Sequence, residues 1–181
     1  RTDWNVAQIA SGADLTVIVG GDLTNRGGSI GAVNDMLLAA AGEVTFETLQ
    51  DTYLLKDYRQ RGFLSGLKVV EHAITTQEAA AETLLGDMKI LAGYSLCDGG
   101  DLCRREGAAA SDAIFNGAMV SAYGALAVKA SGDIDMGTVS AEVVNSYRAW
   151  GFQGLGWGSV KRGWNEIDTR GMRLSGDDIT L

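Results

Sequence analysis

The sequence predicts a mainly α domain with minor β, and an α+β arrangement is the alternative. Three observations indicate this. Proline is absent, so no residue forbids helix hydrogen bonds. Ala-rich segments lie on both sides of residues 97–103, and several segments place apolar residues at helical spacing. With 181 residues, we expect a single domain over 1–181, with 1–12 as a lead-in and 151–181 as a Gly/Trp-rich C-terminal tail.

The first elements can be read in chain order. The β-branched run Leu15–Val19 predicts a strand that Gly20-Gly21 closes. Ser29 can cap a helix that continues to Ala41, because apolar residues recur there at steps of three and four. A second helix is expected from Thr45 to Arg61. Residues 67–75 permit either a strand or a helix.

The centre of the predicted fold is a helical hairpin packed through small residues. Thr75 and Glu78 form a capping box that opens a helix with a narrow apolar stripe up to Leu91. Residues 102–129 form the second helix, with small residues at four-residue spacing. A further helix ends at Trp150, and the tail forms turns and short strands. Short strands therefore lie near both ends of the expected fold.

The tip of this hairpin holds both cysteines, Cys97 and Cys103. Five intervening residues, two of them glycine, allow the side chains to meet at disulfide geometry. A disulfide there closes the turn and indicates an extracellular, cell-surface, periplasmic or virion location. Two free thiols are the alternative. A zinc site lacks ligands, because His72 is the single histidine and no second cysteine pair exists.

Short Gly-Asp phrases recur along the chain without a fixed period, so the sequence does not predict a repeat architecture. We interpret them as turn chemistry. The phrases are Gly12-Ala13-Asp14-Leu15, Gly21-Asp22-Leu23, Gly100-Asp101-Leu102, Gly132-Asp133-Ile134 and Gly176-Asp177-Asp178-Ile179.

The formal net charge is −8 and the pI is near 4.6. Bulk electrostatics therefore disfavours nucleic acid and anionic membrane surfaces as partners, since the basic residues are scattered along the sequence. No apolar run reaches the ~20 residues of a transmembrane helix. The start at Arg1 is interpreted as a processed terminus or a fragment boundary.

No catalytic constellation is evident, so the enzyme question leans to no and we expect no cofactor. The Gly-rich stretch from Gly20 to Ser29 follows a predicted strand, but it lacks the lysine of a phosphate-binding loop. Carboxylates in Gly-rich loops are weak calcium candidates that match no twelve-residue calcium loop. They are Asp98, Asp101, Asp133 and Asp135.

Four aromatic residues gather near the C-terminal tail: Trp150, Phe152, Trp157 and Trp164. Glycines and the pair Lys161-Arg162 lie among them. They are candidates for a subunit interface, with a lid on the core or a ligand surface as alternatives.

The function that these observations favour is a non-enzymatic structural subunit of an extracellular or viral assembly, such as a filament or shell protein. Copies of the same chain are the expected partner. One alternative is a secreted or periplasmic binding module that uses the Trp/Gly-rich tail. The other is an enzyme that relies on Asp and Glu carboxylates.

Overall fold

The computed structural model describes residues 6–62, 65–104, 109–153 and 156–181. All regular structure in this part of the chain is β-strand, and it contains no helix. The predicted mainly α fold is therefore wrong, and so is its central helical hairpin. Nor do these residues contain a helix with the length and hydropathy of a membrane span.

The chain forms two compact units. The solenoid unit comprises residues 6–49, 77–139 and 170–181, and the hairpin unit comprises residues 50–76 and 140–169. The chain thus leaves the first unit twice and returns to it each time. The expectation of one domain over 1–181 stays a prediction.

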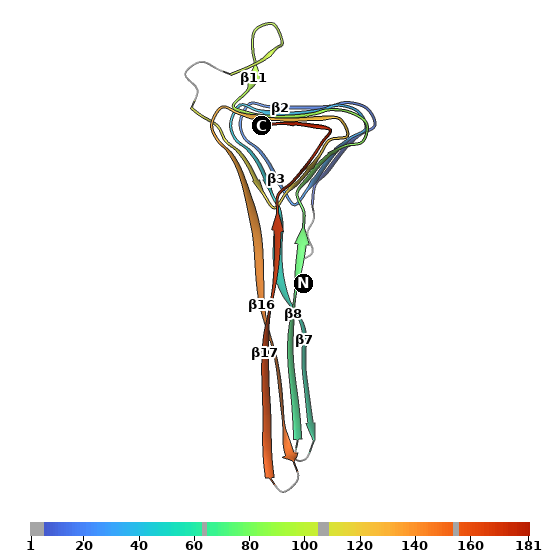
Figure 1. Cartoon of the computed structure of the whole chain (residues 1–181), viewed down its shortest axis with the longest axis vertical. Helices are drawn as coiled ribbons and strands as arrows, with labels where there is room; N and C mark the ends of the chain where they lie inside the picture. The colour runs from blue at the N-terminus through green and yellow to red at the C-terminus, as the bar shows by residue number, and fades with distance from the viewer. Residues whose placement is uncertain (1–5, 63–64, 105–108, 154–155) are drawn as a thin grey trace. The chain divides into compact units, whose positions relative to one another are not determined.

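The solenoid unit consists of three parallel sheets around a core of triangular cross-section (Figure 1). The first sheet has the order β1 (Gln8–Ser11), β4 (Ser29–Ala32), β9 (Ala80–Thr83), β14 (Met119–Ser121), β18 (Arg173–Ser175). The second has the order β2 (Leu15–Val19), β5 (Met36–Ala40), β10 (Met88–Ala92), β15 (Ala125–Ala130), β19 (Asp178–Thr180). The third joins β3 (Leu23–Arg26), β6 (Val44–Glu47), β13 (Ala113–Asn116) and the start of β16 (Ile134–Gln153).

Successive turns of the chain stack in register, which makes this unit a β-solenoid. Gln8 pairs with Ser29, and Leu15 pairs with Met36, so one rung advances the chain by 21 residues. Later rungs are longer because segments are inserted at their corners. The sequence analysis therefore missed a repeat architecture, because the insertions hide its period in the sequence.

Inward-facing side chains of equivalent strands form columns through the solenoid. Leu38 pairs in register with Ile90, which pairs with Val128, and all three are buried. The Phe46 and Phe115 rings stack with centroids 5.7 Å apart. In-register stacking of like side chains thus fills the core with apolar columns.

The apolar spacing along a rung explains why the sequence suggested helices. Buried residues are two apart within a strand and four apart across a corner. Ala32 precedes Met36 by four residues, and Ala40 precedes Val44 by four. A step of four is also the helical step, so the corners imitate an amphipathic helix.

Each expected helix is a run of strands and corners. Residues 29–41 form β4 and β5, and residues 45–61 form β6 and most of β7 (Leu49–Gly62). Residues 75–91 contain the end of β8 (Ser65–Gln77), then β9 and β10. Residues 102–129 contain β12 (Leu102–Cys103), β13, β14 and β15, with residues 105–108 outside the described part. Residues 138–150 lie within β16. The expected strand at Leu15–Val19 is β2.

The hairpin unit is built from long antiparallel strands. In β16, Ser146–Gly151 pairs with Ser65–Val70 of β8, and β7 and β17 (Gly156–Gly171) flank this central pair. Trp150 pairs with Gly66, where any side chain would overlap the indole ring. The backbone N–H of His72 donates to Oδ1 of the buried Asn145 at 2.6 Å. The tail residues 156–171 are thus one long strand rather than short ones.

Candidate functional site

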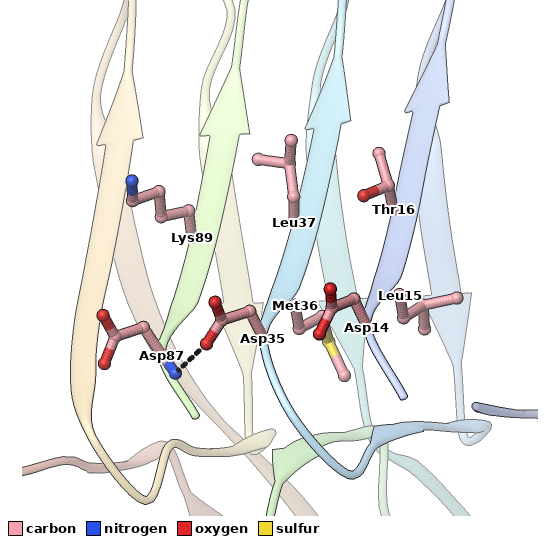
Figure 2. A pocket seen from close by; sticks show the side chains of 8 residues that line it. All are labelled: Asp14, Leu15, Thr16, Asp35, Met36, Leu37, Asp87 and Lys89. Atoms are coloured by element: carbon pink, nitrogen blue, oxygen red, sulfur yellow. Dashed lines mark hydrogen bonds between the residues drawn. The ribbon is translucent and has the colours of Figure 1, made fainter. Parts of the chain in front are cut away.

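The corner between the first and second sheets carries a column of carboxylates. Asp14, Asp35 and Asp87 occupy the same position on three successive rungs, immediately before β2, β5 and β10 (Figure 2). Together with the outward-facing residues that follow them, including Lys89, they line an open depression of about 230 Å³.

Two of these carboxylates, Asp35 and Asp87, accept hydrogen bonds from the backbone of the next rung. Oδ1 of Asp35 accepts from the N–H of Asp87 at 2.9 Å, as Figure 2 shows, and Oδ1 of Asp87 accepts from the N–H of Ala125 at 2.8 Å. The corner N–H groups lie outside the strand ladders, so the carboxylates supply acceptors that the ladders do not. The column therefore stabilises rung stacking.

The corner between the second and third sheets repeats the arrangement. Oδ1 of Asp22 accepts from the N–H of Glu43 at 3.0 Å, and Oδ1 of Asp112 accepts from the N–H of Asp133 at 2.8 Å. The interpretation of the Gly-Asp phrases as turn chemistry is confirmed for Gly21-Asp22-Leu23 and Gly132-Asp133-Ile134.

Glycine beside an aspartate of the preceding rung has a steric cause at several corners. A Cβ on Gly42 would overlap the Asp22 carboxylate, and one on Gly124 would overlap the Asp87 carboxylate. Gly132 stands in the same relation to Asp112. At these three positions an aspartate on one rung therefore requires a glycine on the next.

Two buried polar residues close the remaining corner, and the sequence reasoning missed both. Asn25 donates from Nδ2 to the Gly28 carbonyl and accepts the Gly28 N–H on Oδ1, each at 3.0 Å. The Thr48 hydroxyl donates to the Gly117 carbonyl at 2.8 Å and accepts the Ala79 N–H at 3.1 Å. A period of 21 residues was an available signal for the acidic columns, since it separates Asp14 from Asp35, Asp22 from Glu43, and Asp112 from Asp133. It does not mark Asn25 or Thr48, because Phe46 and Gly27 stand 21 residues from them.

The predicted disulfide between Cys97 and Cys103 is confirmed, with a Cα–Cα distance of 6.0 Å. It closes a β-hairpin, not a helical one, between β11 (Ser95–Leu96) and β12. Gly99 and Gly100 have positive φ in the turn. A disulfide here is compatible with an oxidising extracellular environment.

The four aromatic candidates all lie in the hairpin unit. Trp150 and Phe152 belong to β16, and Trp157 and Trp164 belong to β17. Phe152 and Trp157 meet edge to face with centroids 6.1 Å apart and remain 60% and 59% exposed. Within this unit they do not form a buried core. Their role as interface residues stays a prediction.

The structure separates the weak calcium candidates. Asp98 and Asp101 lie in the disulfide-closed turn, whereas Asp133 and Asp135 lie at the second corner and the start of β16. Among the described residues, no three His, Cys, Asp or Glu side chains are grouped to hold a metal ion. The Gly-rich stretch 20–29 contains β3 and two corners, so no helix follows it as a phosphate site requires.

Comparison with protein families, with curated proteins and with solved structures finds no match for this chain.

Proposed function

We propose that this chain is a non-enzymatic structural subunit of an extracellular or viral assembly, and that copies associate by stacking solenoid rungs. One observation carries the proposal. The sheets of the solenoid place β1, β2 and β3 at one end of their strand orders, and β18 and β19 at the other end of theirs. Each of these strands has a described neighbour on one edge only.

An open parallel edge favours addition of a further strand. Its N–H and C=O groups form a row that a second strand can pair with, and natural sheets block such edges with charge, proline or bulges. Here the edge strand β2 alternates Leu15, Val17 and Val19 against the core with Thr16 and Ile18 outside. Stacking another rung on it would extend both the backbone ladder and the apolar columns.

Light scattering and electron microscopy of two matched variants test this proposal. Val17→Lys places a charge at the open end of an apolar column, whereas Leu84→Lys places the same charge at an exposed corner between the interior strands β9 and β10. We expect association of the unmodified chain and of Leu84→Lys, and its loss in Val17→Lys. A monomer at all salt and protein concentrations, with native circular dichroism, contradicts the proposal.

A second candidate, a binding module, is favoured by a different observation. The hairpin unit exposes large apolar side chains along β7, β16 and β17, including Leu55, Val144, Phe152 and Trp157. Exposed apolar patches on stable proteins commonly mark partner sites. Under this reading the solenoid is a scaffold and the hairpin unit is the contact surface.

A further inference from the structure

The charge of this chain is divided between its two units. The solenoid unit has sixteen acidic and seven basic residues, which give it a formal charge of −9. The whole chain has a formal charge of −8, so the residues outside the solenoid unit together have a formal charge of +1. The segments 58–70 and 143–165 contain no Asp or Glu at all. Strand pairing brings them together, since Ser65–Val70 lies beside Ser146–Gly151. We name their described residues the turn end of the hairpin unit.

The turn end carries basic side chains without acidic partners nearby. Lys68, Arg148, Lys161 and Arg162 belong to it, and among the described residues no ion pair is seen for Lys68, Lys161 or Arg162. Arg59 contacts Asp57 at 3.9 Å, just outside the segment. Some of the basic residues that are scattered in the sequence are therefore brought together in the structure as a positively charged site.

Both faces of the sheet carry aromatic residues here. Tyr147 and Ala149 line one depression with Val160, Arg162 and Trp164. Arg148 and Trp150 line another with Trp157 and Ser159. Successive residues of a strand point to opposite faces, so these depressions lie on opposite sides of the sheet. The Arg148 guanidinium lies 5.8 Å from the centre of the Trp150 ring.

From this arrangement we propose that the turn end binds an anionic lipid surface, with its aromatic side chains at headgroup depth. Tryptophan favours the membrane–water interface, and basic residues add attraction to anionic lipid. A folded protein partner would cover one face of the sheet, whereas the headgroup region of a lipid surface would contact both faces of a sheet end inserted into it. The outer edges of β7 and β17 limit the depth, because unpaired backbone groups are not tolerated in hydrocarbon.

The acidic residues elsewhere in the hairpin unit do not prevent this interaction. At physiological salt the screening length is about 8 Å, so a surface responds to the charges next to it. The acidic residue nearest to Lys161 along β17 is Glu166, which lies five residues away, about 17 Å of extended strand or about two screening lengths. This inference does not depend on the self-association proposed above.

Vesicle binding by the full chain tests the proposal. The probes are vesicles of phosphatidylcholine alone and of phosphatidylcholine with phosphatidylglycerol, measured by co-sedimentation and tryptophan emission. We expect binding to the anionic vesicles, a blue shift of the emission, and quenching by lipids brominated near the headgroup. Absence of binding to anionic vesicles at low salt overturns the proposal.

Two substitutions with equal charge change locate the site. Lys161→Glu lies in the turn end, and Lys129→Glu lies on the exposed side of β15. We expect at least a tenfold loss of vesicle binding for Lys161→Glu, since each basic residue near the surface contributes about fivefold. For Lys129→Glu we expect less than a twofold change. Equal losses in both variants overturn the proposal.

The apolar contribution is tested separately with Trp157→Ala and, as control, Tyr123→Ala, which removes an aromatic residue that is 64% exposed in the solenoid unit. We expect a fivefold or larger loss of vesicle binding for Trp157→Ala alone.

Soluble heparin serves as a polyanion without an apolar phase. Equal tightness for heparin and vesicles, with no effect of Trp157→Ala, identifies a polyanion site and overturns the lipid assignment. Light scattering that shows Lys161→Glu dissociating an oligomer, without lipid dependence, assigns the surface to copies of this chain and overturns it too.

Discussion

Substitution of Gly124 by alanine tests the coupling between glycine and aspartate on adjacent rungs. The added Cβ would overlap the Asp87 carboxylate, which accepts the Ala125 N–H at 2.8 Å. The carboxylate must then leave that N–H. A hydrogen bond to a charged acceptor at an exposed corner contributes about 1–1.5 kcal/mol, so the free energy of unfolding should fall by that amount.

The same substitution should have little effect once Asp87 is alanine. Apart from the Asp87 side chain, the nearest atom to the new Cβ would be the Gly86 carbonyl carbon at 3.5 Å, an ordinary contact. Gly124→Ala should then change stability by less than about 0.5 kcal/mol, and it even gains from the smaller entropy of the unfolded chain. The expected coupling in the double-mutant cycle is about 1 kcal/mol.

Urea denaturation of the four proteins in this cycle measures the coupling, provided that the m-value is unchanged. Gly31→Ala is the control, because a Cβ there meets nothing within 4 Å, and its effect should be near zero. Effects of Gly124→Ala and Asp87→Ala that add within about 0.3 kcal/mol would refute the reasoning.

Three further predictions concern the core, the third corner and the disulfide. Phe115→Ala should lower the free energy of unfolding by about 3–5 kcal/mol, because it opens a cavity in a fully buried column. Phe115→Leu should lower it by less, and equal losses in the two variants would contradict the packing argument. Thr48→Val should cost about 1–3 kcal/mol in urea denaturation, since it leaves a buried N–H and C=O unpaired, whereas Thr48→Ser should retain most of the stability. Replacing Cys97 and Cys103 by serine should raise amide hydrogen exchange in β11 and β12 only, and faster exchange throughout the solenoid would show that the disulfide acts beyond its hairpin.

The helix predictions were wrong because a four-residue spacing of apolar residues occurs both in helices and at solenoid corners. A step of four residues is the helical repeat, and it is also the distance across a solenoid corner, as from Ala40 to Val44. Alternation by two, as in Met36, Leu38 and Ala40, was the strand signal. It was obscured because neighbouring outward positions are alanine and leucine instead of polar residues. Ala39, for example, faces outward and is still buried.

The repeat was hidden by a different cause. The 21-residue step from Gln8 to Ser29 is the bare rung, but insertions separate Ser29 from its next partner Ala80 by 51 residues. Pairing across an insertion is a tertiary event, and the local sequence on either side does not record it. Gly42, Gly124 and Gly132 each lie beside an aspartate of the preceding rung, but the number of residues between glycine and aspartate varies along the chain.

The sequence by itself determined the chemistry of short segments. The disulfide between Cys97 and Cys103 follows from five flexible intervening residues, the strand at Leu15–Val19 follows from β-branched side chains, and the Gly-Asp phrases follow from the needs of tight turns. Only the tertiary structure decided which segments become neighbours. It stacked the aspartates into columns, and it gathered basic and aromatic residues from 58–70 and 143–165 at one end of a sheet. The physical reason is the distance along the chain over which each interaction acts. Turn and strand preferences act over a few residues, whereas rung stacking and charge segregation depend on pairings between strands that are far apart in the chain.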